Sequence, residues 1–160
     1  MIEEKNFEKY YEQIAVKLDE IIPTDWDRIV MYAEEIGDMS FACFYYYTNN
    51  NKEVHHCGNI PEECNVDRKT YDSLLYELMD INKDLWVEFK KAGKPPWCTL
   101  TFYLDKDWRF KVNYGYEIDL EISPLERELR WAYDELGLIP EYSYERKLLD
   151  RYLEGKANKD

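Results

Sequence analysis

Two neighbouring segments in the second half of the sequence alternate between apolar and polar residues. Cys98, Leu100, Phe102 and Leu104 are the apolar positions of the first, and the alternation resumes in 108–116 after the short segment 105–107. A period of two places alternate side chains on opposite faces of a β-strand. Two such strands joined by three polar residues predict a β-hairpin. The chain must therefore build an antiparallel sheet with a face that other elements bury.

Three further strands are predicted before this hairpin. The run from Phe41 to Tyr47 is apolar or aromatic at every position, so we expect residues 40–48 to form a central strand that is covered, at least in part, on both faces. Segments 26–34 and 54–57 are shorter or weaker strand candidates. Asn49-Asn50-Asn51 predicts a turn, because asparagine tolerates the left-handed backbone conformation.

Apolar residues at spacings of three and four predict helices over residues 5–22 and 67–92. Ser123-Pro124-Leu125-Glu126 is a capping box that begins a third helix, and Gly137 ends it. A final short helix follows Ser143. The polar residues 154–160 are expected to form a frayed tail.

These elements predict an α+β fold. The sheet is antiparallel with about five strands, helices pack on it, and the order is α-β-β-β-α-β-β-α-α. The sequence shows no repeat or linker, and 160 residues fit one domain spanning 1–160.

The chain carries 34 acidic against 21 basic residues, a net charge of −13. A field of this sign repels nucleic-acid phosphates and anionic membrane surfaces, so neither is an expected partner. It would speed the encounter with a basic protein. The same acidity could serve solubility alone, and the charge does not decide between the two interpretations.

The N-terminal sequence predicts a cytoplasmic protein. Glu3 and Glu4 lie where a signal peptide carries basic residues, and no apolar segment long enough to cross a membrane follows. The four cysteines are irregularly spaced without a CxxC pair, which indicates reduced thiols.

No motif for nucleotide binding, serine hydrolysis or zinc proteolysis is present. The most metal-like stretch is His55-His56-Cys57 with Cys64, but adjacent histidines on a strand point to opposite faces. We therefore predict no metal, no cofactor and no catalytic residue. A small hydrolase or transferase with an unrecognised site is the alternative.

Five acidic residues and one tryptophan form the candidate partner-binding set. The acidic residues fall within twelve positions and could simply be a solvated loop and a helix first turn, where acids suit the helix dipole. The alternative is that they form an acidic face for a basic partner. Trp131 lies off the apolar stripe of its helix, and core packing competes with a role as a contact anchor. The set is Glu117, Asp119, Glu121, Glu126, Glu128 and Trp131.

Short segments along nearly the whole chain are similar, in the same order, to those of one protein family. They are Ile21-Ile22-Pro23 to Trp26, Tyr32-Ala33-Glu34, Phe44-Tyr45-Tyr46, Pro96-Trp97 with Thr99-Leu100-Thr101-Phe102, Phe110-Lys111-Val112 with Tyr114 and Tyr116, Trp131-Ala132-Tyr133, and Leu136-Gly137-Leu138-Ile139-Pro140. On these segments the chain resembles the YezG/EsaG-like immunity proteins of Gram-positive bacteria, antitoxins of secreted nuclease toxins.

The resemblance implies a cytoplasmic, non-enzymatic protein that binds and blocks a nuclease toxin exported by the type VII secretion pathway. It therefore implies a basic nuclease domain as partner. An adaptor or chaperone role overlaps with this interpretation, since an immunity protein can also stabilise a toxin before export. The shared positions are helix stops, strand aromatics and a helix cap, so they indicate the fold and do not locate the toxin-binding surface.

Overall fold

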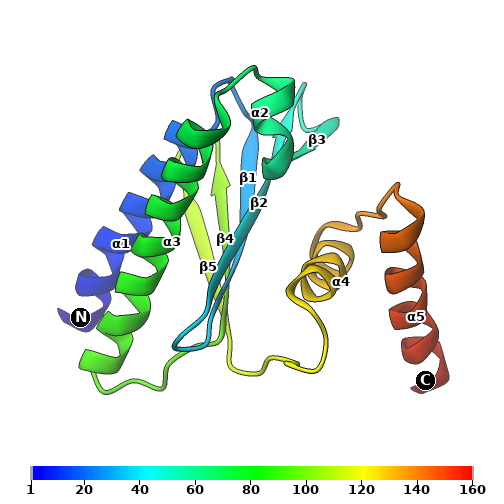
Figure 1. Cartoon of the computed structure of the whole chain (residues 1–160). Coiled ribbons are helices and arrows are strands. Elements are labelled where there is room, and N and C mark those ends of the chain that lie inside the picture. Colours follow the sequence, from blue (N-terminus) through cyan, green and yellow to red (C-terminus); the bar gives the residue numbers. More distant parts are fainter. Residues whose placement is uncertain (1, 160) are drawn as a thin grey trace. The chain divides into compact units, whose positions relative to one another are not determined.

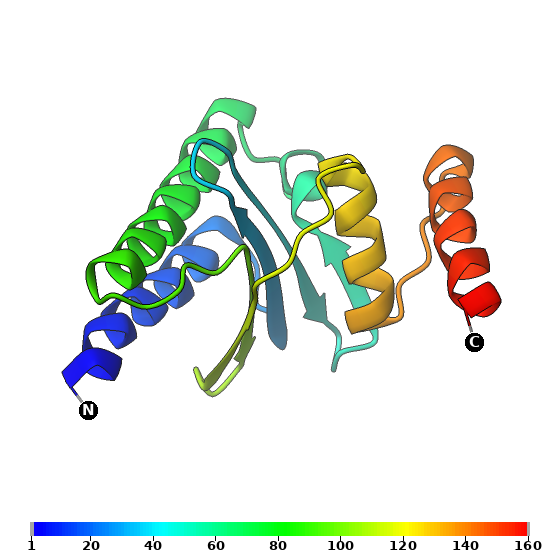
Figure 2. The same cartoon turned by 90° about the horizontal axis from the view of Figure 1, so that it is seen from below.

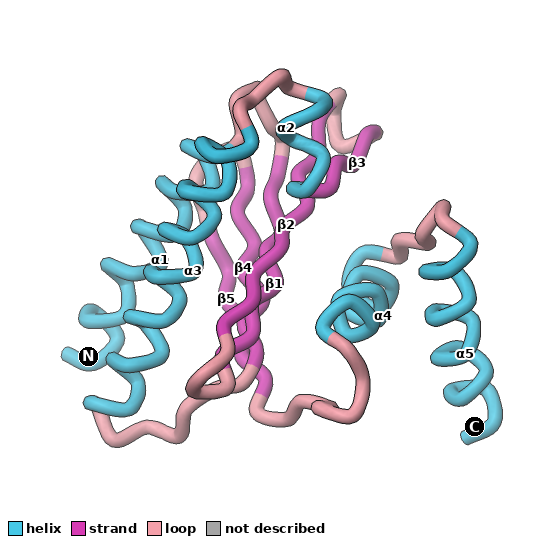
Figure 3. Tube along the Cα trace, viewed as in Figure 1, coloured by secondary structure: helices cyan, strands magenta, loops and turns pink. Residues whose placement is uncertain are grey.

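A computed structural model describes residues 2–159, with side chains described from Asn6 to Asn158. The chain divides into two compact units, one up to Ile118 and one from Asp119 onward. The boundary lies in the irregular loop between the last strand and the helix that follows it (Figure 3). Each unit is described by itself below.

The first unit contains the sheet and its covering helices. Its elements are α1 (Ile2–Ile21), β1 (Arg28–Glu35), β2 (Ser40–Thr48), β3 (Glu53–His56), the 3-10 turn η1 (Cys57–Asn59), α2 (Ile60–Glu63), α3 (Arg68–Lys91), β4 (Thr99–Asp105) and β5 (Phe110–Gly115). The predicted order of strands and long helices is confirmed, while the short elements η1 and α2 were not predicted.

All five strands pair antiparallel in the order β3-β2-β1-β4-β5. The predicted hairpin is β4–β5, with Phe102 opposite Val112. The middle position belongs to β1, in which Ile29 to Glu35 are all buried. The aromatic run in β2 was expected at the centre. Strand β2 is an interior strand next to the central one. The central position is taken by β1, which pairs with β2 on one side and with β4 on the other.

Helices α1 and α3 lie side by side over one face of the sheet (Figures 1 and 2). Leu18 of α1 and Leu85 of α3 are fully buried, as the helical spacing predicts. Phe7 stacks on Phe89 with the ring centroids 4.3 Å apart, which ties the two helices together. The expectation that helices pack on the sheet is thus confirmed within this unit.

Left-handed backbone forms the turn between β2 and β3. Asn49, Asn50 and Asn51 have φ angles of 55°, 57° and 64°, which asparagine adopts at less cost than most residues. The backbone N–H of Asn51 donates to Asp27 Oδ2 at 3.0 Å. The predicted asparagine turn is therefore confirmed.

The second unit consists of α4 (Pro124–Leu136) and α5 (Ser143–Lys159). Ser123 Oγ accepts a hydrogen bond from the Glu126 N–H at 3.1 Å, and Gly137 ends α4 at φ 70°, so both predicted caps form. Helix α5 continues to Lys159, through residues for which a frayed tail was expected, and Asp160 lies outside the described residues. Lys156 Nζ pairs with Asp134 of α4 at 2.8 Å, which stabilises this last part of α5.

A buried amide in α3 lacks a complete set of partners. Asn82 is 1% exposed, and its Nδ2 reaches only Met31 Sδ at 3.8 Å. Its Oδ1 has no hydrogen-bond partner among the described residues. We expect Asn82→Leu to raise the free energy of unfolding by about 1 kcal/mol, because it removes an unsatisfied buried acceptor. Urea denaturation checks this, with exposed Asn113→Leu as the control; a less stable Asn82→Leu variant would contradict it.

Candidate partner-binding surface

Three of the predicted acidic residues are exposed in the loop that connects β5 to α4. Glu117 belongs to the first unit, and Asp119 and Glu121 begin the second. Asp119 Oδ1 accepts a hydrogen bond from the Glu121 N–H at 3.0 Å, which fixes the local backbone conformation. All three side chains are nevertheless exposed to solvent. A cationic partner can therefore reach them without breaking an ion pair.

The two acidic residues on α4 are placed differently. The side chain of Glu126 is only 14% exposed and pairs with Arg130 at 2.9 Å, with Arg151 at 3.9 Å. Glu128 is buried, at 8% exposed. Trp131 is half-buried. The predicted set therefore divides into three loop residues that face solvent and three helix residues that are engaged in, or partly covered by, the folded chain.

Arg127 anchors the loop, a role that sequence reasoning missed. One of its guanidinium nitrogens donates to the carbonyl oxygens of Asp119 at 2.9 Å and Ile122 at 2.6 Å, and the residue is 8% exposed. A signal did exist in the sequence. Helical side chains lean toward the helix N-terminus, so an arginine four residues after the cap Ser123 can reach the carbonyls that precede the helix.

The histidines and cysteines do not form a metal site. His55 lies opposite Tyr46 and His56 opposite Tyr45, so the two rings are on opposite faces, as predicted. His55 Nε2 is hydrogen-bonded to Thr48 Oγ1 at 2.7 Å, and His55 Nδ1 lies 3.5 Å from Glu63 Oε2. Over the described residues, no group of three His, Cys, Asp or Glu could hold a metal ion, and all four cysteines are free.

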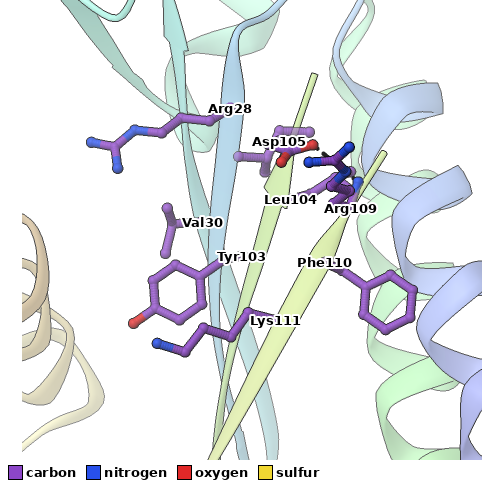
Figure 4. Close-up of a pocket in the computed structure, with 9 residues that line it drawn as sticks. Arg28, Val30, Tyr103, Leu104, Asp105, Arg109, Phe110 and Lys111 are labelled. Atoms are coloured by element: carbon purple, nitrogen blue, oxygen red, sulfur yellow. Dashed lines mark hydrogen bonds between the residues drawn. The ribbon is translucent and has the colours of Figure 1, made fainter. Parts of the chain in front are cut away.

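Three hollows lie on the described part of the chain. One hollow of about 230 Å³ lies over β1, β4 and β5 (Figure 4), one of about 270 Å³ lies against α1, and one of about 530 Å³ is lined by α5 alone. Glu35 is a buried carboxyl whose pKa is raised by burial, but it contacts Ser40 and Lys83 and lines none of these hollows. The shifted carboxyl and the hollows are thus in different places, which gives the enzyme alternative no support.

Comparison with known proteins identifies relatives along nearly the whole chain. The family model described as "Immunity protein YezG-like" matches residues 7–150. "Immunity protein YezG" of Bacillus spizizenii is 34% identical over 151 residues, covering 93% of this chain and 94% of that protein. "Immunity protein YezG" of Bacillus subtilis is 32% identical over 89% of this chain and 96% of its own length.

A third relative carries a different name. "Type VII secretion system protein EsaG" of Staphylococcus aureus is 28% identical over 145 residues, covering 89% of this chain and 88% of that protein. The family model and the relatives, which match about nine-tenths of the chain, define it as a protein of the immunity class. It belongs to the YezG-like immunity protein family. Between residues 2 and 159, no helix has the length and apolarity needed to cross a membrane.

The anchoring role of Arg127 can be tested by removing its charge and its donors while keeping an unbranched, flexible side chain. We expect Arg127→Met to lower the free energy of unfolding by roughly 2 kcal/mol, since two carbonyls lose a charged donor. Urea denaturation measures the loss, and limited proteolysis should show faster cleavage within residues 119–123. Arg146→Met is the control, because Arg146 makes only an exposed ion pair with Asp150. Equal stability of the two variants would contradict the anchoring role.

Proposed function

We propose that this chain binds a nuclease toxin of the type VII secretion pathway in the cytoplasm and neutralises it. The observation that carries the proposal is the match to immunity proteins over residues 7–150, joined by a relative named as a type VII secretion system protein. The chain acts by protein binding and not by catalysis, in keeping with the immunity proteins it resembles.

The distribution of charge favours a basic partner. Residues 1–118 contain 23 acidic against 14 basic side chains, and residues 119–160 contain 11 against 7, so both units are acidic. A nuclease must present a basic surface to phosphate groups. An acidic protein can compete for that surface, with fast electrostatic capture and slow release.

Within this proposal, the contact residues are the acidic and aromatic set identified in the sequence. Glu117, Asp119 and Glu121 make the primary contact, because they are exposed and form no ion pair with any described residue. Three residues of α4 make a secondary contribution. A toxin could contact them only if their side chains repacked or exchanged their present ion-pair partners. These residues are Glu126, Glu128 and Trp131.

Reversing the charge of the exposed loop tests the proposed contact. We expect Glu117→Lys, Asp119→Lys and Glu121→Lys together to raise the Kd for the toxin by about tenfold or more, since electrostatic complementarity is lost. Isothermal titration calorimetry or surface plasmon resonance measures the change, and circular dichroism checks the fold.

A matched control separates the loop from net charge. Glu12, Asp80 and Asp84 are exposed acidic residues of α1 and α3, and reversing all three changes the net charge by the same amount. The control should change the Kd by less than about threefold, as expected of charges outside a contact. Equal losses in the two triple variants would remove the loop from the contact surface.

A nuclease protection assay tests the function itself. The full chain is mixed with toxin nuclease domains from the same and related strains, and DNA cleavage is followed at two salt concentrations. We expect stoichiometric inhibition of one nuclease that weakens at high salt, because the attraction between exposed charges is screened. Binding without inhibition would favour the adaptor role, and absence of binding across the panel would contradict the proposal.

A further inference from the structure

Strand β5 forms one edge of the sheet and pairs only with β4. The backbone N–H of Asp105 donates to the carbonyl of Arg109 at 3.0 Å. Because hydrogen-bonded and non-bonded positions alternate in an antiparallel pair, Lys111 and Asn113 direct their backbone groups to β4. The intervening residues direct their N–H and C=O groups away from the sheet, and no hydrogen bond within the described part of the chain engages them. They are Phe110, Val112 and Tyr114.

Three cations that make no ion pair within the described part of the chain lie beside this edge. Arg109 and Lys111 are exposed at the beginning of β5, and both line the hollow of about 230 Å³. Arg28 lines it from β1, and in Figure 4 its side chain lies on the same side of the sheet as those of Tyr103 and Lys111. The Lys111 ammonium lies 5.4 Å from the centre of the Tyr103 ring.

The acidic residue of this hollow offsets only part of the positive charge, because Asp105 is one carboxylate beside the three cations Arg28, Arg109 and Lys111. Asp105 Oδ1 accepts from the backbone N–H groups of Asp107 and Arg109, at 2.9 Å and 3.0 Å, and is held in the β4–β5 turn. Arg28 lies over the Tyr47 ring, 3.9 Å from its centre, and not against a carboxylate. The edge therefore carries a local positive charge in a chain whose net charge is −13.

The other face of the same strand is apolar. Phe110 points toward the helices in Figure 4 and borders the hollow of about 270 Å³ with Phe7, Glu8 and Tyr11 of α1. The Tyr11 and Phe110 rings lie 5.6 Å apart. The Tyr11 and Tyr114 hydroxyls are hydrogen-bonded at 2.6 Å, which fixes α1 beside β5. Strand β5 thus borders one hollow that holds three cations and, beside α1, a second hollow that is lined mainly by aromatic rings, and Phe110 lines both.

We propose that an extended segment of the toxin adds to β5 as a sixth strand of the sheet. Successive side chains of an added strand face opposite sides, so an acidic residue would meet Lys111 and Arg109 while its apolar neighbour packs against Phe110 and α1. The inference rests on the proposed function, since it takes the toxin as the partner. It gives that partner a second feature, an acidic and apolar strand in addition to a basic surface.

A second copy of this chain is a poorer occupant of the edge. In an antiparallel pairing of β5 with another β5 through the three outward residues, Val112 would face Val112, so Lys111 would lie opposite Asn113 and would meet no acidic side chain of the second copy. The edge also leads within two residues to Glu117 in the acidic loop. A toxin held at β5 would therefore lie near Glu117, the one residue of the proposed primary contact that belongs to the same unit as β5.

Amide hydrogen exchange followed by NMR tests the inference on the full chain, free and bound to the toxin nuclease domain. In the free protein, the amides of Lys111 and Asn113 should exchange slowly, because they bond to β4. On binding, we expect the amides of Phe110, Val112 and Tyr114 to slow by at least about tenfold, as new interstrand hydrogen bonds form.

The outcomes separate this inference from the proposed function. Toxin binding with unchanged exchange at all three outward amides would overturn strand addition and leave the toxin-binding function in place. Absence of any toxin binding would overturn both. Concentration-dependent protection of the same amides in the protein alone would show that a second copy occupies the edge, and would also overturn the inference.

A charge-reversal pair supplies an independent measurement. Arg109→Glu with Lys111→Glu should raise the Kd for the toxin by about tenfold, since both cations would face the acidic side chain of the added strand. Lys52→Glu with Lys69→Glu is the matched control, because it makes the same change in net charge at exposed positions outside both hollows. Equal affinity of the two double variants would contradict the proposed role of the cations.

Discussion

The pairing of β1 along both of its edges is the constraint on which the first unit depends. Its backbone is bonded to β2 on one side and to β4 on the other, so two hairpins that are separated by helix α3 in the sequence become one sheet. Because all of Ile29 to Glu35 is buried, a shift of register by one residue would move apolar side chains to the wrong face. The same pairing leaves β5 at the edge, where its outer backbone groups have no strand to meet.

The positive and negative charges of the protein are unevenly distributed, which the net charge alone does not show. Acidic residues exceed basic ones in both units, which suits a partner with a cationic surface. Against that background, the acidic residues of the β5–α4 loop remain free while Glu126 is paired inside the second unit. The basic hollow beside β5 has the opposite sign. A partner must then carry basic groups for the acidic loop and acidic groups for the basic hollow. Fewer proteins meet both requirements than are attracted by net charge alone, so the two features together favour specificity.

Much of the fold could be predicted because its signals are local. The alternation in 98–104 and 108–116 defined the β4–β5 hairpin, Ser123 and Gly137 defined the ends of α4, and the asparagine run defined a turn. The errors were tertiary in origin. The aromatic run of β2 suggested the central strand, but position in a sheet depends on which strands pair. The end of α5 was missed because its stabilising partner Asp134 lies on another helix.

The sequence by itself determined the fold class, the family and the acidic character of this immunity protein, because periodicity, capping residues, charge and similarity can be read along the chain. Only the tertiary structure decided which charges are available. In the sequence, Glu117, Glu126 and Glu128 are equivalent acidic residues. In the structure, Glu126 is ion-paired and Glu128 is buried. The same holds for the free edge of β5. Burial and strand neighbours arise from contacts between segments distant in the sequence, and no local pattern encodes them.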